Sequence, residues 1–411
     1  MDASRAQDLP SVTVAPFDQH DAAFIADPYP VFAALRARAE VHWHEGMGVA
    51  LAVSHASASA VLRHRGLGRL WTDARPVAEF AAFNLLHRNS LLENEPPTHT
   101  RLRRLVAAAF GRGHVERLRP WITELADRLV DGLVAEVRAE GQADLLSHVA
   151  APLPVEVIAE LLGVPAVDRA LLQPWSNAIV KMYEFDLAPD KKAAAERAAG
   201  EFTAYLRDLV ARRRASPGDD LVSDLVAVTD ADGAKLTEDE LVATAVLLLM
   251  AGHEATVNVI GNGVHALLAH RDQWERVVAD QSLLSTAVEE LIRYDSPLQL
   301  FERTATERVE IGGFVVEEGR KIAALLGAAA RDPKVFDHPD VLDVSRTPNA
   351  HLGFGMGIHY CLGAPLARIE VRAALSSLSR KMPGAVPAAE PRRRAEFVIR
   401  GLHELPLGDG Q

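Results

Sequence analysis

The chain has almost no cysteine, since Cys361 is the only one among its 411 residues. A single thiol cannot form an internal disulfide, so the small secreted folds that depend on a disulfide framework are excluded. Scarce cysteine is typical of proteins that work in a reducing compartment. The first residues also lack the basic stretch and apolar run of a signal peptide. We therefore expect a cytoplasmic protein.

Long apolar runs and an excess of positive charge are also missing. The most apolar stretch, residues 241–252, is shorter than the roughly 18 residues that a membrane-spanning helix needs. The net charge is −12, which disfavours nucleic acid as the main partner because phosphate binding requires a basic surface. The chain is 48% hydrophobic, enough for a large core. We expect a globular monomer that binds neither membrane nor nucleic acid.

Hydrophobic periodicity predicts a mainly helical chain with small sheets. Apolar residues recur at helical spacing over residues 122–137. A long helix is expected to begin after Thr237, because Glu240 three residues later completes a capping box. Toward the C-terminus the pattern alternates in the manner of short strands. We expect an N-terminal arm over residues 1–20, followed by a single domain over residues 21–411.

The surroundings of Cys361 differ from those of an ordinary buried thiol. Gly355 and Gly363 flank it, and a helix is expected to begin at Gly363. Amide groups at a helix N-terminus stabilise a thiolate, the form that binds metals and attacks electrophiles. A zinc site would need more Cys or His ligands than His351 and His359 provide. The residues alone leave three roles open: a small buried apolar side chain, a nucleophile or the single thiolate ligand of a haem.

The stretch FGMGIHYCLGAPLAR, residues 354–368, resembles the haem-binding loop of the cytochrome P450 family. That loop has the pattern Phe-x-x-Gly-x-His-x-Cys-x-Gly, followed by Ala-Arg. The matching residues are Phe354, Gly357, His359, Cys361, Gly363, Ala367 and Arg368. The resemblance implies haem b with Cys361 as its axial thiolate and metal ligand, and with Gly355 beside it. It also implies the mainly α P450 fold with small β-sheets, in which the haem lies between a long distal helix and the cysteine loop.

Other segments match the same family, in the same order, along nearly the whole chain. Glu290 and Arg293 match a Glu-x-x-Arg pair that is buried behind the haem and braces the cysteine loop. Residues three apart share a helix face, and without the resemblance this pair would be an ordinary surface ion pair. Because partly buried propionates require charged donors, the resemblance also implies haem-binding roles for His99, Arg103, Arg303 and His359.

The long helix carries the sequence LLLMAGHEATVN, which resembles the oxygen-activation motif Ala-Gly-x-Asp/Glu-Thr-Thr of the family. Ala251, Gly252 and Glu254 match, whereas Ala255 replaces the first Thr and Thr256 follows it. Cleavage of dioxygen needs protons, and the missing hydroxyl normally helps the acid to deliver them. Thr256 lies about 100° further round the helix and is not a simple replacement.

Three interpretations of Ala255 follow. In the first, which we favour, a substrate hydroxyl or an extra ordered water takes the place of the missing hydroxyl. In the second, the reaction depends less on proton delivery, as in oxidative coupling or the use of peroxide. In the third, the protein is a non-catalytic haem-thiolate sensor, although the retained Glu254 argues against this.

The resemblance implies a monooxygenase that inserts one oxygen atom from O2 into a hydrophobic small molecule, by hydroxylation or epoxidation. No flavin or NAD fingerprint is visible, so electrons are expected from a separate ferredoxin or flavodoxin with its NAD(P)H reductase. The other class to consider is a helical binding protein without haem.

A basic docking patch is predicted at Arg101, Arg104, Arg380 and Lys381. The expected substrate contacts, mostly apolar, are Asn84, Leu247, Leu248, Val259, Leu298, Gln299 and Ile399.

Overall fold

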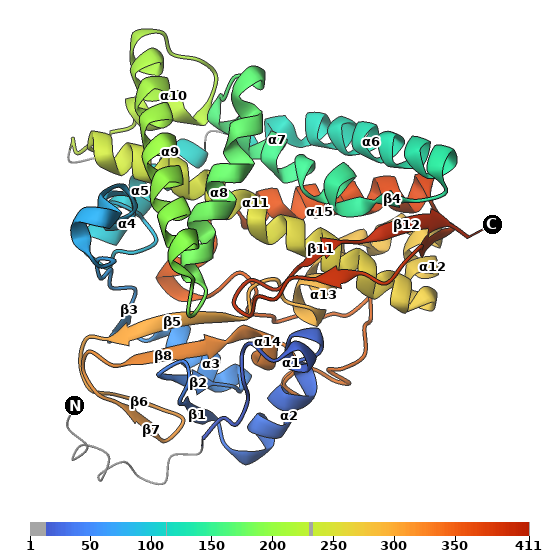
Figure 1. The fold of residues 1–411 in the computed structure, drawn as a ribbon, viewed down its shortest axis with the longest axis horizontal. Helices are drawn as coiled ribbons and strands as arrows, with labels where there is room; N and C mark the ends of the chain where they lie inside the picture. Colours follow the sequence, from blue (N-terminus) through green and yellow to red (C-terminus); the bar gives the residue numbers. More distant parts are fainter. Residues whose placement is uncertain (1–13, 112, 230–232, 411) are drawn as a thin grey trace.

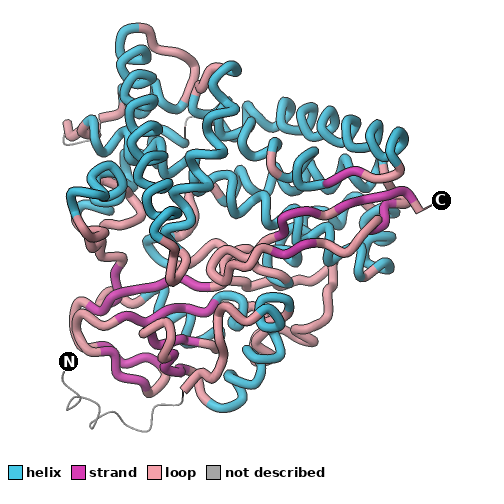
Figure 2. The backbone as a smooth tube through the Cα atoms, in the orientation of Figure 1, coloured by secondary structure: helices cyan, strands magenta, loops and turns pink. Residues whose placement is uncertain are grey.

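The structure, a computed structural model, describes residues 14–111, 113–229 and 233–410. In Figure 1 the long helices occupy the upper and right-hand parts, and the largest group of strands lies at the lower left. Figure 2 shows the same separation of helical and strand regions along the backbone. The predicted fold class, mainly helical with small sheets, is confirmed.

Helices form most of the described chain. Their bounds are α1 Ala22–Ala26, α2 Tyr29–Arg38, α3 His55–Arg63, α4 Ala81–Arg88, α5 Thr98–Phe110, α6 His114–Glu140, α7 Pro152–Leu162, α8 Leu172–Val180, α9 Pro189–Ala215, α10 Leu221–Ala227, α11 Glu238–Ala269, α12 Arg271–Ala279, α13 Leu284–Tyr294, α14 Leu326–Ala329 and α15 Ala364–Lys381. Short helical turns include Lys181–Tyr183 between α8 and α9, and Gly357–His359 before Cys361.

The strands form small sheets. Their bounds are β1 Val41–His44, β2 Val49–Ala52, β3 Leu67–Gly68, β4 Ala143–Asp144, β5 Leu300–Ala305, β6 Val309–Ile311, β7 Phe314–Val316, β8 Lys321–Leu325, β9 Ala385–Pro387, β10 Arg392–Arg393, β11 Leu402–Glu404 and β12 Pro406–Asp409. The largest sheet has the order β1-β2-β8-β5-β3. Its antiparallel pair β5–β8 places Arg303 of β5 opposite Ile322, so an inner strand next to the central one carries one of the predicted haem-binding side chains.

Helix α11 is the central element of the helical part. Thr237 accepts from the backbone of Glu240 and the Glu240 side chain accepts from Thr237, which confirms the predicted capping box. Among the described helices, α11 is long and apolar enough to cross a membrane, but 72% of its most apolar window is buried inside the protein. Its apolar composition is therefore explained by packing against α7, α9, α13 and α15.

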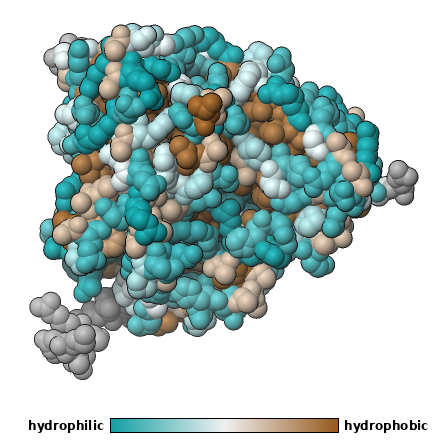
Figure 3. Space-filling view, turned by 45° about the horizontal axis from the view of Figure 1, so that its top comes forward, coloured by the Kyte–Doolittle hydropathy of each residue, from teal (hydrophilic) through white to brown (hydrophobic). Residues whose placement is uncertain are grey.

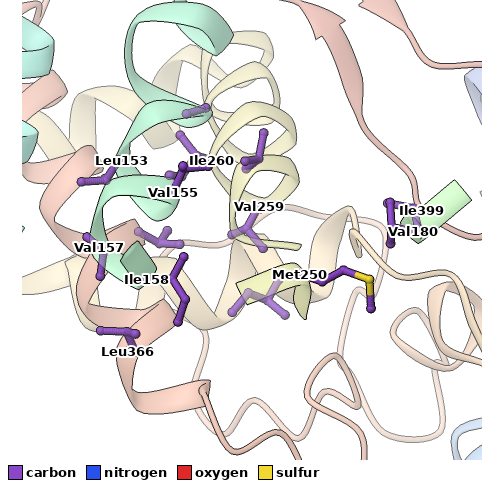
Figure 4. Packing of buried hydrophobic residues seen from close by; sticks show 14 of the residues in the cluster. Leu153, Val155, Val157, Ile158, Val180, Met250, Val259, Ile260, Leu366 and Ile399 are labelled. Carbon is purple, nitrogen blue, oxygen red and sulfur yellow. The ribbon is translucent and has the colours of Figure 1, made fainter. Parts of the chain in front are cut away.

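The core is continuous across α7, α11 and α15. Figure 4 shows Leu153 and Ile158 of α7 beside Ile260 of α11 and Leu366 of α15. Gly252 allows α7 and α11 to approach closely, because a Cβ at this position would lie 3.2 Å from Ile158. The surface in Figure 3 is mainly hydrophilic, with small separate apolar areas.

The predicted N-terminal arm lies mostly outside the described residues. Where the description begins, Val14 pairs with Trp43 of β1, and the amide of Ala15 donates to the Trp43 carbonyl at 2.8 Å. The carbonyl of Phe17 accepts from His44 at 2.9 Å. The last part of the predicted arm therefore packs on β1, while the boundary at residue 20 and the single domain over 21–411 stay predictions.

Candidate functional site

The cysteine loop is a compact turn that leads into α15. Cys361 is half-buried, and its amide donates to the Phe354 carbonyl at 2.9 Å. Gly357 has φ +69°, and a Cβ there would lie 2.7 Å from the carbonyl oxygen of Leu62. Only glycine tolerates both the left-handed conformation and this close approach. The Arg368 guanidinium lies 4.4 Å from the centre of the Phe354 ring, which fixes the start of α15 against the loop.

The electrostatics of the thiol differ from the simple expectation of a stabilised thiolate. Burial raises the pKa of the Cys361 thiol, whereas the backbone amides of Gly363 and Ala364 and the charge of Arg103 act in the opposite direction. Desolvation is the largest of these effects. The amides at the N-terminus of α15 are nevertheless directed to the sulfur, and a coordinated cation deprotonates such a thiol outright.

Three of the predicted propionate donors have no carboxylate partner among the described residues. His99 is 2% exposed, its Nε2 has no hydrogen-bond partner, and burial followed by the charge of His359 lowers its pKa to about 4. Arg303 is 3% exposed and donates only to the Glu302 carbonyl. Burial, then Arg69, lowers its pKa to about 10.

Arg103, from the same face of α5 as His99, donates to the Tyr360 carbonyl at 2.7 Å. It therefore connects α5 to the residue directly before Cys361. This contact leaves the rest of the guanidinium available to an anion, and the predicted roles of these donors stay predictions.

The fourth predicted donor, His359, has a partner that the sequence did not indicate. Its Nε2 lies 2.7 Å from the Glu95 carboxylate. Glu95, in the segment before α5, also accepts from the Arg69 amide at 2.8 Å, so it connects the cysteine loop to the residue that follows β3. The centres of the His99 and His359 rings lie 4.4 Å apart, so the two imidazoles form one cluster.

The Glu290–Arg293 pair is completely buried, with 0% exposure of both side chains. Arg293 donates to the two carboxylate oxygens at 2.7 and 2.8 Å. Arg346 also reaches Glu290, at 3.0 Å, and the Asp343 amide donates to it at 2.9 Å. Arg293 donates in addition to the carbonyls of Ala330, Pro339 and Val341. The pair therefore holds the segment that precedes the cysteine loop.

One stripe of α11 is accessible although the rest of its middle is buried. From residue 241 to 264 the only residues that are not buried are Leu247, Leu248, Ala251, Gly252 and Ala255. Positions 247, 251 and 255 follow one another at four-residue intervals, so they lie on one helix face. Gly252 is the exception, because it approaches α7. The accessible stripe is where the sequence predicted the oxygen-binding and substrate-binding face.

Glu254 lies beside this stripe and is buried, with 4% exposure. Its carboxylate forms an ion pair with Arg394, which directly follows β10, and its other oxygen lies 3.7 Å from Nε2 of His253. Thr256 is also buried, and its hydroxyl donates to the Gly252 carbonyl at 3.3 Å. The Thr256 hydroxyl is therefore committed to the helix backbone.

The other predicted pocket residues differ in what their side chains contact. Leu298 pairs with Ile399 through an isolated bridge, which brings two predicted contacts together. Gln299 is buried with its Oε1 unpartnered. Asn84 bonds through both side-chain atoms to the backbone of Ala74, so its polar atoms support a loop. Val259 is 6% exposed and belongs to the core.

Three of the four residues of the predicted basic docking patch form ion pairs, and the patch itself stays a prediction. Arg101 pairs with Glu240, Arg380 with Asp127, and Lys381 with Asp131. Their charges are neutralised by neighbours far away in the sequence, which single-residue reading does not detect.

The donor set fits a haem. A half-buried thiol at a helix N-terminus supplies one anionic ligand, which is sufficient for haem iron. His99, Arg103 and Arg303 supply hydrogen-bond donors without carboxylate partners among the described residues, as two propionates would require. The accessible stripe of α11 is apolar, as a porphyrin face would require. Residues 14–111, 113–229 and 233–410 contain no group of three or more His, Cys, Asp and Glu residues able to hold a metal ion.

Comparison with known proteins agrees with this site. The family model "Cytochrome P450" matches residues 49–382. The chain is 42% identical to cytochrome P450 monooxygenase PikC of Streptomyces venezuelae over 391 residues, covering 93% of this chain and 91% of that protein. It is 40% identical to vitamin D(3) 25-hydroxylase of Pseudonocardia autotrophica, over 97% and 99% of the two chains. The solved structure of PksS, the cytochrome P450 of the Bacillus subtilis bacillaene polyketide synthase, superposes with a TM-score of 0.86 at 34% identity, over 96% and 100%. The chain belongs to the cytochrome P450 family of haem-thiolate monooxygenases.

Proposed function

We propose that this P450 hydroxylates or epoxidises a bulky hydrophobic secondary metabolite, foremost a polyketide. The observation that supports this most is the apolar, accessible stripe of α11 beside the buried Glu254. For hydroxylation the balanced reaction is RH + O2 + 2e⁻ + 2H⁺ → ROH + H2O. The relatives include a vitamin D(3) hydroxylase and a polyketide synthase P450, which supports a large apolar substrate.

Each group of residues in the site has its own role in the proposed reaction. A haem held through the Cys361 sulfur would supply the iron chemistry that activates dioxygen. His99, Arg103 and Arg303 hold the propionates, and His359 acts with them through its cluster with His99. Leu247, Leu248, Ala251 and Ala255 form an apolar wall that excludes bulk water. Glu254 is the acid that relays protons to the oxygen atom that leaves as water.

The test of this function is a titration of the purified ferric protein against polyketides, sterols and fatty acids, followed through the Soret band. A low- to high-spin shift is expected with one class. That ligand is then incubated with NADPH, surrogate ferredoxin and reductase under 18O2. A product that carries one 18O atom supports the proposal. Shifted protein that gives no labelled product with ferredoxin or flavodoxin would contradict it, and dimeric or peroxide-dependent products would identify the coupling or peroxide alternative.

Ala255 gives a prediction about proton delivery. Because Ala255 has no hydroxyl and the Thr256 hydroxyl is bonded to Gly252, a substrate hydroxyl or an ordered water must complete the relay. We expect Ala255→Thr to retain turnover and coupling within about threefold, since the added hydroxyl repeats an existing function. Ala255→Val, which has the same shape without the hydroxyl, is the matched control.

The measurement is product formed per NADPH consumed. A hydroxyl-free substrate analogue should uncouple the parent enzyme and be rescued by Ala255→Thr but not by Ala255→Val. Full coupling of the parent with that analogue would remove the substrate hydroxyl from the relay and leave water. A large gain in coupling with Ala255→Thr on the natural substrate would show that delivery in the parent is deficient.

We further propose that a small acidic redox protein, foremost a ferredoxin, docks beside the cysteine loop. Ile358 and Tyr360 are 48% and 41% exposed there. The last residue of α3, Arg63, adjoins the loop, since a Cβ at Gly357 would lie 3.5 Å from its Cα. Arg63 and the nearby Arg65 are exposed and form no ion pair with any described residue. An apolar centre with a basic rim suits a transient, electrostatically steered partner.

Reversing these charges should weaken the docking. We expect the double variant Arg63→Glu/Arg65→Glu to raise the KM for ferredoxin roughly tenfold at low salt, with substrate affinity unchanged. The effect should shrink as salt is added, because screening removes the attraction. Arg138→Glu, an exposed position in the last turn of α6, is the control. Equal effects of the two substitutions would place the docking surface elsewhere.

A further inference from the structure

The ion pair between Glu254 and Arg394 joins two elements that are distant in the sequence. The side chains are 6% and 16% exposed, so the pair is largely removed from water. Arg394 is itself fixed, since its Nε donates to the Leu402 carbonyl at 3.3 Å and its amide donates to the Gly401 carbonyl at 3.1 Å. The guanidinium therefore moves only if the turn between β10 and β11 moves.

The same turn is attached to the connection between α8 and α9. Lys181 forms an ion pair with Glu396, and the Glu184 carboxylate accepts from the amides of Val398 at 3.1 Å and Ile399 at 2.9 Å. Figure 4 shows Ile399 beside Val180, the last residue of α8. Two polar attachments and one apolar contact thus hold the turn against this connection.

A second path leads from α8 to Glu254. His253 is buried, and its Nε2 lies 3.3 Å from the Asn177 side-chain oxygen and 3.7 Å from the Glu254 carboxylate. Its Nδ1 lies 3.2 Å from the Leu249 carbonyl. The second oxygen of Glu254 is therefore next to an imidazole that contacts α8. The positions of both carboxylate oxygens of Glu254 therefore depend on the positions of α8 and of the connection that follows it.

We propose that Arg394 is a positioning residue for Glu254, and that the attachments of the turn between β10 and β11 to the α8–α9 connection keep Arg394 in place. The proposal rests on the proposed role of Glu254 as proton relay. Arg394 holds the carboxylate at one place beside the accessible stripe. Without the contacts to Lys181 and Glu184, the turn would be less restrained, and so would the Glu254 carboxylate.

The position of the Glu254 carboxylate affects how many electrons form product and how many are lost as hydrogen peroxide. A carboxylate that is free to move delivers protons at the wrong time, and electrons are then lost in the side reaction O2 + 2e⁻ + 2H⁺ → H2O2. A held carboxylate keeps proton delivery at one place beside the accessible stripe. Removal of Arg394 should therefore change the partition between product and peroxide more than it changes substrate binding.

The first test uses the resting, haem-loaded protein without substrate or electrons. Arg394→Gln is expected to speed hydrogen exchange at the amides of Val398 and Ile399 roughly tenfold, because these amides lose protection when the turn loosens. Arg394→Lys should restore part of the protection. Arg392→Gln is the matched control: it lies on the same hairpin, but its side chain is 68% exposed and pairs with Glu404. Equal exchange in the parent and Arg394→Gln would overturn the proposal without reference to turnover.

The second test measures product and peroxide per NADPH, together with the substrate Kd. Arg394→Gln is expected to lower coupling at least about threefold with Kd changed less than twofold, and Arg392→Gln to change neither. Lys181→Met should lower coupling as well, and should add little in the Arg394→Gln background, because both act through one turn. Losses that multiply independently would refute the linkage. Labelled product with unaffected coupling in Arg394→Gln would reject this inference alone, whereas absence of product in the parent would reject the proposed function.

Discussion

Cys361→Ser should abolish monooxygenase turnover, with a loss on the order of a thousandfold or more, and should remove the thiolate-type spectrum of the reduced carbonyl complex. Serine keeps the size of the side chain but is not deprotonated under conditions in which a coordinated thiol is. The electron donation that a thiolate supplies is therefore lost. The measurement is the carbonyl difference spectrum of the purified variant, together with turnover on the ligand found by titration.

The structure makes this substitution a clean test. The loop contact of Cys361 is made by its backbone amide, which donates to Phe354, so serine leaves the turn intact. Tyr360→Phe is the matched control for the carbonyl spectrum, because the contact of Tyr360 with Arg103 also uses the backbone. An unchanged carbonyl spectrum in Cys361→Ser would mean that the axial ligand is a different residue.

The features that could be predicted from the sequence are those that depend on residues close together in the chain. The capping box at Thr237 and Glu240 needs only three residues of spacing, and helical periodicity over residues 122–137 predicted a large part of α6. The cysteine loop is contiguous, so its glycines and its helix start could be read directly.

The features that were missed connect residues far apart in the chain. Arg394 and Glu254 are 140 residues apart, and Glu95 and His359 are 264 apart. Neither pair has a spacing rule, because tertiary packing alone brings its members together. The ion pairs of Arg101, Arg380 and Lys381 were missed for the same reason, since their acidic partners come from other helices. Sequence reading therefore predicted the chemistry of the site and the Glu290–Arg293 pair, whose spacing is local, but not the partners that only tertiary packing brings together.

Glu290→Leu should destabilise the protein by about 5 kcal/mol, more than Arg293→Met, for which we expect about 3 kcal/mol. The difference follows from the number of partners that each side chain serves. Without Arg293, the Glu290 carboxylate still has Arg346 and the Asp343 amide. Without Glu290, two guanidinium groups, one of them with 0% exposure, lose their only carboxylate partner among the described residues. The measurement is the free energy of unfolding of the haem-loaded protein in urea.

The control for this pair has the same spacing and the opposite environment. Glu116 and Arg119 are also three apart, but their side chains are 67% and 46% exposed, so Arg119→Met should cost less than about 0.5 kcal/mol. The double variant Glu290→Leu/Arg293→Met should lose less than the sum of its two parts, because the second substitution removes a cation that the first left unpaired. Additive losses would mean that the two residues act separately. A smaller loss for Glu290→Leu than for Arg293→Met would mean that the backbone carbonyls held by Arg293, rather than the ion pair, are what stabilise the segment before the cysteine.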